Sequence, residues 1–179
     1  MACGVKYSAS LYAARADLRA GYSLEINVAE QREDNDFARW VAALQQAIIE
    51  QERALFSEAV LREARHPQNM TVMPEPDGHA LVRGPCGDTM EIFLRIHNSQ
   101  IETAAFMTDG CGPTVACGSM LTCMVQGKSL EEAGTLEAAE LIIALDGLPP
   151  EHIHCATLAV DTLQEAMKNG HIQSKEGTE

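Results

Sequence analysis

Three short stretches of the sequence place side chains that can bind metals or act as nucleophiles where the backbone turns. GPCGD contains Cys86 and Asp88, DGCGP contains Cys111, and HIHC contains His154 and Cys155. Glycine beside such a residue lets the backbone approach a bound group closely. A helix N-terminus favours a thiolate, because its free N–H groups and its dipole stabilise negative charge. We therefore expect Cys111 and Cys155, each at the start of a helix, to have lowered pKa values and to be reactive.

These side chains would form a mixed set of soft and hard metal ligands. A structural zinc site usually shows paired C-x-x-C motifs, and the sequence has none. Three cysteines with an aspartate or histidine suit iron with sulfide, or zinc in a site that must open. The residues alone leave both metals as alternatives.

The other cysteines and histidines have simpler interpretations. The chain has 6 cysteines, and without a secretory signal we expect reduced thiols and a cytoplasmic location rather than disulfides. Cys117 and Cys123 lie in an apolar helical stretch and are predicted to be core residues, whereas Cys3 is predicted to be incidental. His152 is interpreted as a solvated turn residue, with an extra metal ligand as the alternative.

The composition excludes some classes of partner. Asp and Glu number 26 against 13 Lys and Arg, which gives a net charge of -13 at pH 7. A nucleic-acid partner would need a basic surface, and a membrane span would need an apolar run of about 18 residues. Neither is present in the sequence, so we expect no nucleic-acid partner and no membrane insertion. A basic or metal-loaded partner is compatible with this charge.

Hydrophobic periodicity places these motifs on predicted elements. Apolar residues at helical spacing predict a helix from about 36 to about 65, with a break near residue 52 and an end before Pro67. Its stripe is interpreted as intramolecular packing, with docking of a second protomer as the alternative; the stripe comprises Phe37, Trp40, Val41, Leu44 and Ile48. Alternating residues predict three strands, which cover about 79–84, 89–97 and 101–108.

The second half of the chain is predicted to be helical. Pro113 suits the first turn of a buried helix that ends near Gly127. Ser129 has capping-box spacing to Glu132 and predicts a short helix. A further short helix and a longer one follow, over about 136–145 and 151–168, and Gly170 is predicted to end the last helix.

The ordered motifs resemble the iron–sulfur cluster assembly scaffold family of the IscU/NifU N-terminal type. They are GPCGDTM, FMTDGCGPTVACGSML, VQGKSLEEA and LPPEHIHCATLAVDTL, and HPQNM is similar to that family's N-P-x-N segment. The resemblance covers about residues 55–170. It implies an α+β fold, in which a small three-stranded antiparallel sheet has helices packed on one side, here with an extra N-terminal helix.

The resemblance also implies a function and a set of ligands. A scaffold of this type is not an enzyme but a carrier, on which a [2Fe-2S] cluster is built from iron and sulfur and then passed on. Its partners would be a cysteine desulfurase, an electron donor such as a ferredoxin, and apo acceptor proteins, and it could form a homodimer. Zinc could occupy the site before the cluster. By position, the cluster or metal ligands would be Cys86, Asp88, Cys111, His154 and Cys155, with Asp88 tuning the lability of the cluster.

The chain departs from the family pattern at two places. The chaperone-binding stretch of the family reads L-P-P-V-K, whereas this chain has Glu151 and His152 after the two prolines, which leaves chaperone binding open. Residues 1–54 lie outside the pattern and are expected to be an N-terminal extension, irregular and then helical. Residues 55–170 would be the scaffold domain and 171–179 a flexible tail.

A zinc-dependent sulfurtransferase of the SufU type is the alternative function, and a non-catalytic adaptor is a third. SufU proteins typically carry an insert between the second and third ligand cysteines and lack a histidine before the last one. Here two short helical segments separate Cys111 from Cys155, and His154 is present. Both features favour the scaffold.

Overall fold

The computed structural model describes the backbone of residues 30–176 and the side chains of residues 35–170. The chain divides into two compact units, residues 1–50 and 51–179. All five predicted ligands belong to the second unit. The elements in chain order are α1 (Glu30–Leu55), α2 (Glu58–Arg65), β1 (Gly78–Arg83), β2 (Thr89–His97), β3 (Gln100–Thr108), α3 (Gly112–Val125), α4 (Leu130–Gly134), α5 (Ala138–Ala144), η1 (Pro150–His152) and α6 (Ile153–Glu176).

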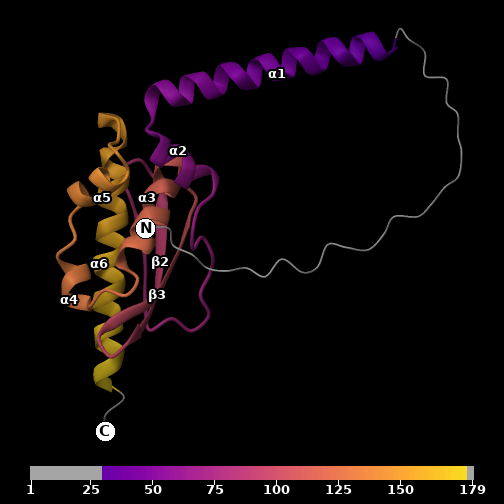
Figure 1. Cartoon of the computed structure of the whole chain (residues 1–179). Helices are drawn as coiled ribbons and strands as arrows, with labels where there is room; N and C mark the ends of the chain where they lie inside the picture. Colours follow the sequence, from indigo (N-terminus) through magenta and orange to yellow (C-terminus); the bar gives the residue numbers. More distant parts are fainter. Residues whose placement is uncertain (1–29, 177–179) are drawn as a thin grey trace, which may run out of the picture. The chain divides into compact units, whose positions relative to one another are not determined.

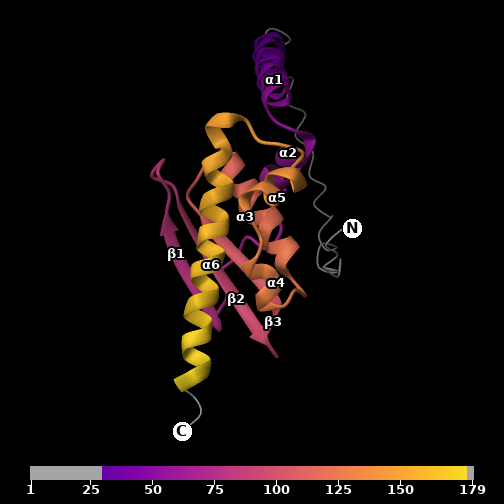
Figure 2. The ribbon, with the colours of Figure 1, turned by 90° about the vertical axis from the view of Figure 1, so that its left-hand side faces the viewer.

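The second unit is built on a small antiparallel sheet. Within residues 30–176 the strand order is β1-β2-β3, and Ile92 in the central strand pairs with Ala80 on one side and Phe106 on the other. Helices α3 and α6 lie next to each other on one face of the sheet, with α6 against β1 and β2 and α3 against β3 (Figure 1, Figure 2). The predicted α+β fold, with helices packed on one side of three strands, is confirmed.

The apolar residues of β2 explain which face carries the core. Met90, Ile92 and Leu94 are each 0% exposed and point to the same face, because side chains alternate along a strand. Phe93 breaks the alternation in the sequence. It lies on the opposite face, where its ring stacks on that of His79 with the centroids 5.0 Å apart.

The long helix predicted over about 36–65 is two helices. The break falls at Phe56 and Ser57 rather than near residue 52, and α1 begins at Glu30, before the predicted start. Ser57 caps α2, because its hydroxyl accepts a hydrogen bond from the Val60 N–H at 3.1 Å. The predicted end before Pro67 is confirmed, since α2 ends at Arg65.

The prediction that Gly170 ends the last helix was wrong, because α6 continues to Glu176. Gly170 is buried against the sheet, and a Cβ atom there would lie 3.1 Å from the Asp77 carbonyl oxygen and 3.2 Å from the Gly78 Cα. The residue therefore serves close packing of α6 on the start of β1. A glycine inside a helix is less favourable than alanine by about 1 kcal/mol, and this packing explains why it is tolerated.

Helix α1 carries the predicted apolar stripe in the first unit. Phe37 and Trp40 are 67% and 62% exposed, and Leu44 and Ile48 are each 48% exposed. The described residues of this unit do not cover the stripe, so its intramolecular packing stays a prediction. No helix in the described part of the chain is both long and apolar enough to cross a membrane.

Candidate metal and cluster site

The predicted ligands come from three places that meet at one end of the sheet. Cys86 and Asp88 lie in the loop between β1 and β2, Cys111 precedes α3, and His154 and Cys155 lie in the first turn of α6. The β1–β2 loop is held by hydrogen bonds from the Gly84 N–H to the Asp88 carbonyl at 2.8 Å and from the Gly87 N–H to the Gly84 carbonyl at 3.1 Å.

Thr114, in the first turn of α3, connects three of these residues. Its hydroxyl donates a hydrogen bond to Asp88 Oδ2 at 3.0 Å. The Thr114 hydroxyl oxygen also lies 3.4 Å from Cys111 Sγ and 3.3 Å from Cys155 Sγ. A hydroxyl has one proton to donate and two lone pairs that accept. That single proton can go to Asp88 Oδ2 or to Cys155 Sγ, and the Cys111 thiol can donate to the Thr114 oxygen.

Asp88 is held at the N-terminus of α3. Its Oδ2 accepts from Thr114 and also from the Cys111 N–H at 3.4 Å. Gly110 makes this approach feasible, because a Cβ atom there would lie 2.7 Å from Asp88 Oδ2 and 2.7 Å from Thr114 Cβ. A carboxylate in this position is favoured by the helix dipole.

The two cysteines that lie next to Thr114 differ in accessibility. Cys111 is exposed and is the N-cap residue of α3, and no side-chain hydrogen bond caps the helix. Cys155 is 0% exposed. Burial raises the pKa of Cys155 to about 11, the neighbouring Cys111 and Cys86 charges add to this, and the Thr114 hydroxyl opposes it. The predicted lowering of the Cys155 pKa was therefore wrong.

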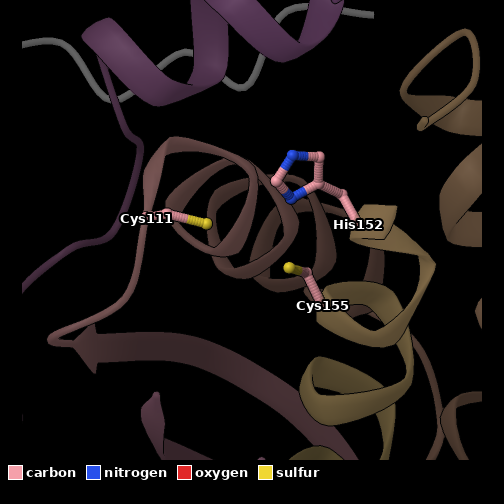
Figure 3. Close-up of side chains that lie close together, drawn as sticks. All are labelled: Cys111, His152 and Cys155. Carbon is pink, nitrogen blue, oxygen red and sulfur yellow. The ribbon is translucent and has the colours of Figure 1, made fainter. Parts of the chain in front are cut away.

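His152 lies close to these two thiols, in agreement with its alternative interpretation as an extra metal ligand. The ligand atoms of Cys111, His152 and Cys155 all lie within 4.8 Å of one another, and Figure 3 shows the imidazole facing the two sulfur atoms. His152 is half-buried, its Nδ1 is buried, and that atom has no hydrogen-bond partner among residues 35–170. The interpretation of His152 as a solvated turn residue was wrong.

His154 and Cys86 lie at the edge of this group. His154 Nε2 is 3.6 Å from Cys155 Sγ, and its ring centroid lies 6.4 Å from that of His152. Cys86 is exposed on the β1–β2 loop and influences Cys155 through its charge. Their ligand roles, like those of the other three residues, stay predictions.

The family described as the NifU-like N terminal domain matches residues 55–176 of this chain. The chain belongs to this family. A relative from Archaeoglobus fulgidus, named iron–sulfur cluster assembly scaffold protein IscU 1, is 36% identical over 66% of this chain and 81% of its own length. Another from Aquifex aeolicus, named iron–sulfur cluster assembly scaffold protein IscU, is 38% identical over 64% of this chain and 74% of its own length.

A solved structure has the same fold. It is that of a nitrogen-fixing NifU-like protein (N-terminal) from Brucella abortus, which matches with a TM-score of 0.53 and 17% identity over 65% of this chain and 94% of that one. At this identity the likeness concerns the arrangement of sheet and helices. It agrees with the three-stranded sheet and the helical layer described above.

The sequence analysis of this NifU-like chain missed Thr114 as part of the site and gave His152 only as an alternative ligand. Thr114 and His152 each lie three residues from a cysteine, Thr114 after Cys111 and His152 before Cys155. Residues three apart on a helix lie on the same face. That spacing was the available signal for both residues.

Of the remaining cysteines, Cys117 fits its predicted place in the core, whereas Cys123 lies outside the buried core. Cys117 is 0% exposed, and burial raises its pKa far above the usual value for a thiol, as expected of a core residue. Cys123 is half-buried and accepts from Asn69 Nδ2 at 3.7 Å. Cys3 lies outside the described residues.

Proposed function

We propose that this NifU-like chain is a scaffold on which an iron–sulfur cluster is assembled and from which the cluster passes to acceptor proteins. The observation that carries the proposal is the convergence of Cys111, Cys155 and Asp88 on the Thr114 hydroxyl. Relatives at 36% and 38% identity bear the name of such scaffolds. A cluster that must be handed on needs thiolate ligands and at least one ligand that exchanges more easily.

In this proposal, iron and sulfur are the substrates and the chain's own residues hold them. Cys86, Cys111 and Cys155 supply thiolates, and Asp88 and His154 supply the oxygen and nitrogen ligands. The assembled product would be a [2Fe-2S] cluster. Asp88 would make it labile, since a carboxylate is a harder and more exchangeable ligand for iron than a thiolate.

Cys111 and Cys155 differ in exposure, and the proposal gives them different steps. Cys111 is exposed and suits the step in which sulfur arrives. Its thiolate would attack the outer sulfur of a desulfurase persulfide, so that a new S–S bond forms on Cys111 and the desulfurase cysteine leaves as a thiolate. Two electrons from a ferredoxin-type donor would then cleave that bond, which yields sulfide and restores the Cys111 thiolate. Cys155 is buried and is therefore less accessible to a desulfurase persulfide, so in this proposal it serves as a metal ligand that is deprotonated when the metal binds.

The proposal also includes the surroundings of the scaffold. Its partners are a cysteine desulfurase, an electron donor and apo acceptor proteins. We further propose a cytoplasmic location, where thiols stay reduced, and the role of a carrier without catalysis. Residues 1–54 form an extension to a scaffold domain that spans 55–170.

A zinc-dependent sulfurtransferase is the second candidate, and one observation favours it. Cys111, His152 and Cys155 form a compact group of the kind that binds zinc. A zinc-bound Cys111 could accept a persulfide sulfur and pass it on without any cluster being formed.

Anaerobic reconstitution tests the choice between these functions. The reduced full chain is incubated with a cysteine desulfurase, cysteine and ferrous iron, and the visible absorption is followed. We expect a sulfur-to-iron absorption band, and its transfer to apo-ferredoxin on mixing. A chain that keeps bound zinc and develops no visible band, while still accepting sulfur on Cys111, would establish the sulfurtransferase instead.

A further inference from the structure

We propose that His152 is a metal ligand, which binds a single divalent ion such as Zn²⁺ through Nδ1 together with Cys111 and Cys155. The inference deepens the proposed function of the same site and rests on it for the two cysteine ligands. It assigns to this chain a nitrogen ligand outside the five residues predicted from the sequence.

The spacing of the three ligand atoms fits a metal ion. Zinc binds sulfur at about 2.3 Å and imidazole nitrogen at about 2.0–2.1 Å, so two ligands of a tetrahedral site lie about 3.5–3.8 Å apart. The three atoms here are within 4.8 Å of one another. Small side-chain rotations would bring them to coordination distance, and Figure 3 shows that the three side chains already face a common space.

The surroundings of His152 indicate that its nitrogen lacks the partner it needs. Nδ1 is buried with no hydrogen-bond partner among residues 35–170, which is unfavourable for a polar atom. The ring packs against that of Phe56, with the centroids 5.4 Å apart. The backbone is held by a hydrogen bond from the His152 N–H to the Pro149 carbonyl at 2.8 Å. A metal ion between Nδ1 and the two sulfurs would satisfy this atom.

The charges of the proposed site balance. Binding converts the Cys111 and Cys155 thiols to thiolates and releases their two protons to solvent. Two thiolates neutralise a divalent ion, and a neutral imidazole adds no charge. The fourth position of a tetrahedral site would remain for a neutral exchangeable ligand such as water. Asp88, whose Oδ2 shares the Thr114 hydroxyl with both sulfurs, could replace that ligand and would then make the site negatively charged.

Zinc affinity tests the inference directly. The reduced, metal-free full chain is titrated with Zn²⁺ in competition with a chromophoric chelator. The His152→Phe variant keeps a ring against Phe56 but removes the nitrogen, and we expect its zinc Kd to rise at least about tenfold. His97→Phe, a change at an exposed histidine at the end of β2, is the matched control and should leave the Kd unchanged. An unchanged Kd in a folded His152→Phe chain would overturn the inference.

A spectroscopic test does not depend on the stability of His152→Phe. Zinc K-edge X-ray absorption of the zinc-loaded His154→Phe variant should retain the scattering of one imidazole, supplied by His152. Loss of the imidazole signal in that variant would identify His154 as the nitrogen ligand and refute the role of His152.

Zinc binding and cluster assembly can fail separately. A chain that binds zinc through His152 but forms no iron–sulfur absorption band would refute the scaffold and leave this inference standing. A chain that forms and transfers a cluster, but binds zinc equally well without the His152 nitrogen, would refute this inference alone.

Discussion

The first turns of α3 and α6 bring a cysteine to the same site, yet the two thiols differ. Cys111 is the exposed N-cap residue of α3, whereas Cys155, in the first turn of α6, is completely buried. A helix N-terminus stabilises a nearby negative charge by about 0.3–1 kcal/mol. Raising a thiol pKa from 9.0 to about 11 corresponds to about 3 kcal/mol against the thiolate. For Cys155, burial therefore outweighs the helix terminus.

At a third helix start, that of α4, the pKa of an acidic group is lowered instead of raised. At α4, Glu132 is exposed and accepts hydrogen bonds from the Ser129 N–H at 2.9 Å and the Ser129 hydroxyl at 2.8 Å. The Ser129 backbone N–H is the main cause of a lowered Glu132 pKa. The position of an acid at a helix start thus predicts a lowered pKa when solvent also reaches the group. At α6, burial reverses that prediction.

The largest expected effect separates the roles of the two cysteines. Cys111→Ser and Cys155→Ser should each abolish the iron–sulfur absorption band, because each removes a thiolate ligand. They should differ in sulfur uptake from a desulfurase: Cys155→Ser keeps the exposed acceptor and gains one sulfur atom by mass spectrometry, whereas Cys111→Ser does not. Equal uptake by both variants would remove the functional difference between the two helix starts.

Cys117→Ala is the control for a cysteine of α3 outside the site. The residue is 0% exposed and belongs to the core, so the variant should lose thermal stability through the cavity it leaves. Its cluster band, measured below the unfolding temperature, should persist. Loss of the band from a folded Cys117→Ala chain would show that this thiol is a ligand after all.

Asp88→Ala tests the exchangeable ligand that lies between the two helix starts. Without the carboxylate, a bound cluster should live longer and transfer to apo-ferredoxin about tenfold more slowly, an effect of the size that changes around metal ligands typically produce. Stopped mixing with apo-ferredoxin, followed by visible absorption, gives the rate. Asp88→Asn keeps the size of the side chain and one oxygen ligand. Its transfer rate should fall between those of the unmodified chain and Asp88→Ala. Unchanged transfer by Asp88→Ala would refute the role assigned to the carboxylate.

Gly110→Ala should disturb the packing that holds Asp88 at the start of α3. The new Cβ would lie 2.7 Å from both Asp88 Oδ2 and Thr114 Cβ, and overpacking of this kind lowers stability by about 1–3 kcal/mol. Gly112→Ala is a matched control two residues away, because its Cβ would meet Ala64 Cβ at an ordinary 3.7 Å. Urea unfolding of the two variants gives the difference. Equal stability would show that the site relaxes without strain.

Local signals predicted most of the fold. Period-two alternation located β2 over residues 89–97, and the spacing of Ser129 and Glu132 predicted a capping box that the structure contains. Each of these signals lies within a few neighbouring residues. The wrong end at Gly170 has the opposite origin, since the backbone of Asp77 and Gly78 lies against that glycine. Contacts between distant parts of the chain overrode the local preference there.

In the site, too, features that depend on neighbouring residues were predicted, and features that depend on distant contacts were not. Cysteines beside glycine, or at a helix start, were visible in the sequence and come together in space at Cys111 and Cys155. Thr114 was not recognised and His152 was not the preferred ligand, because their contacts exist only once α3 packs against α6. The prediction of a lowered Cys155 pKa failed for the same reason. The helix start that carries the thiol can be read from neighbouring residues, but the packing that buries it involves distant parts of the chain.

The smallest expected effect checks the exposed helix start. The pKa of Glu132 is lowered below 4.5 in the folded chain, so its contribution to stability is complete above that pH and is lost as the pH falls through the folded value. Glu132→Gln keeps the capping geometry but does not titrate. It should therefore lose less stability than the unmodified chain between neutral pH and acid, as measured by urea unfolding. Glu131→Gln, at the exposed neighbouring position of α4, should follow the unmodified chain. Parallel pH profiles for Glu132→Gln and the unmodified chain would show that the exposed helix start does not favour its carboxylate, and the contrast with Cys155 would then rest on burial alone.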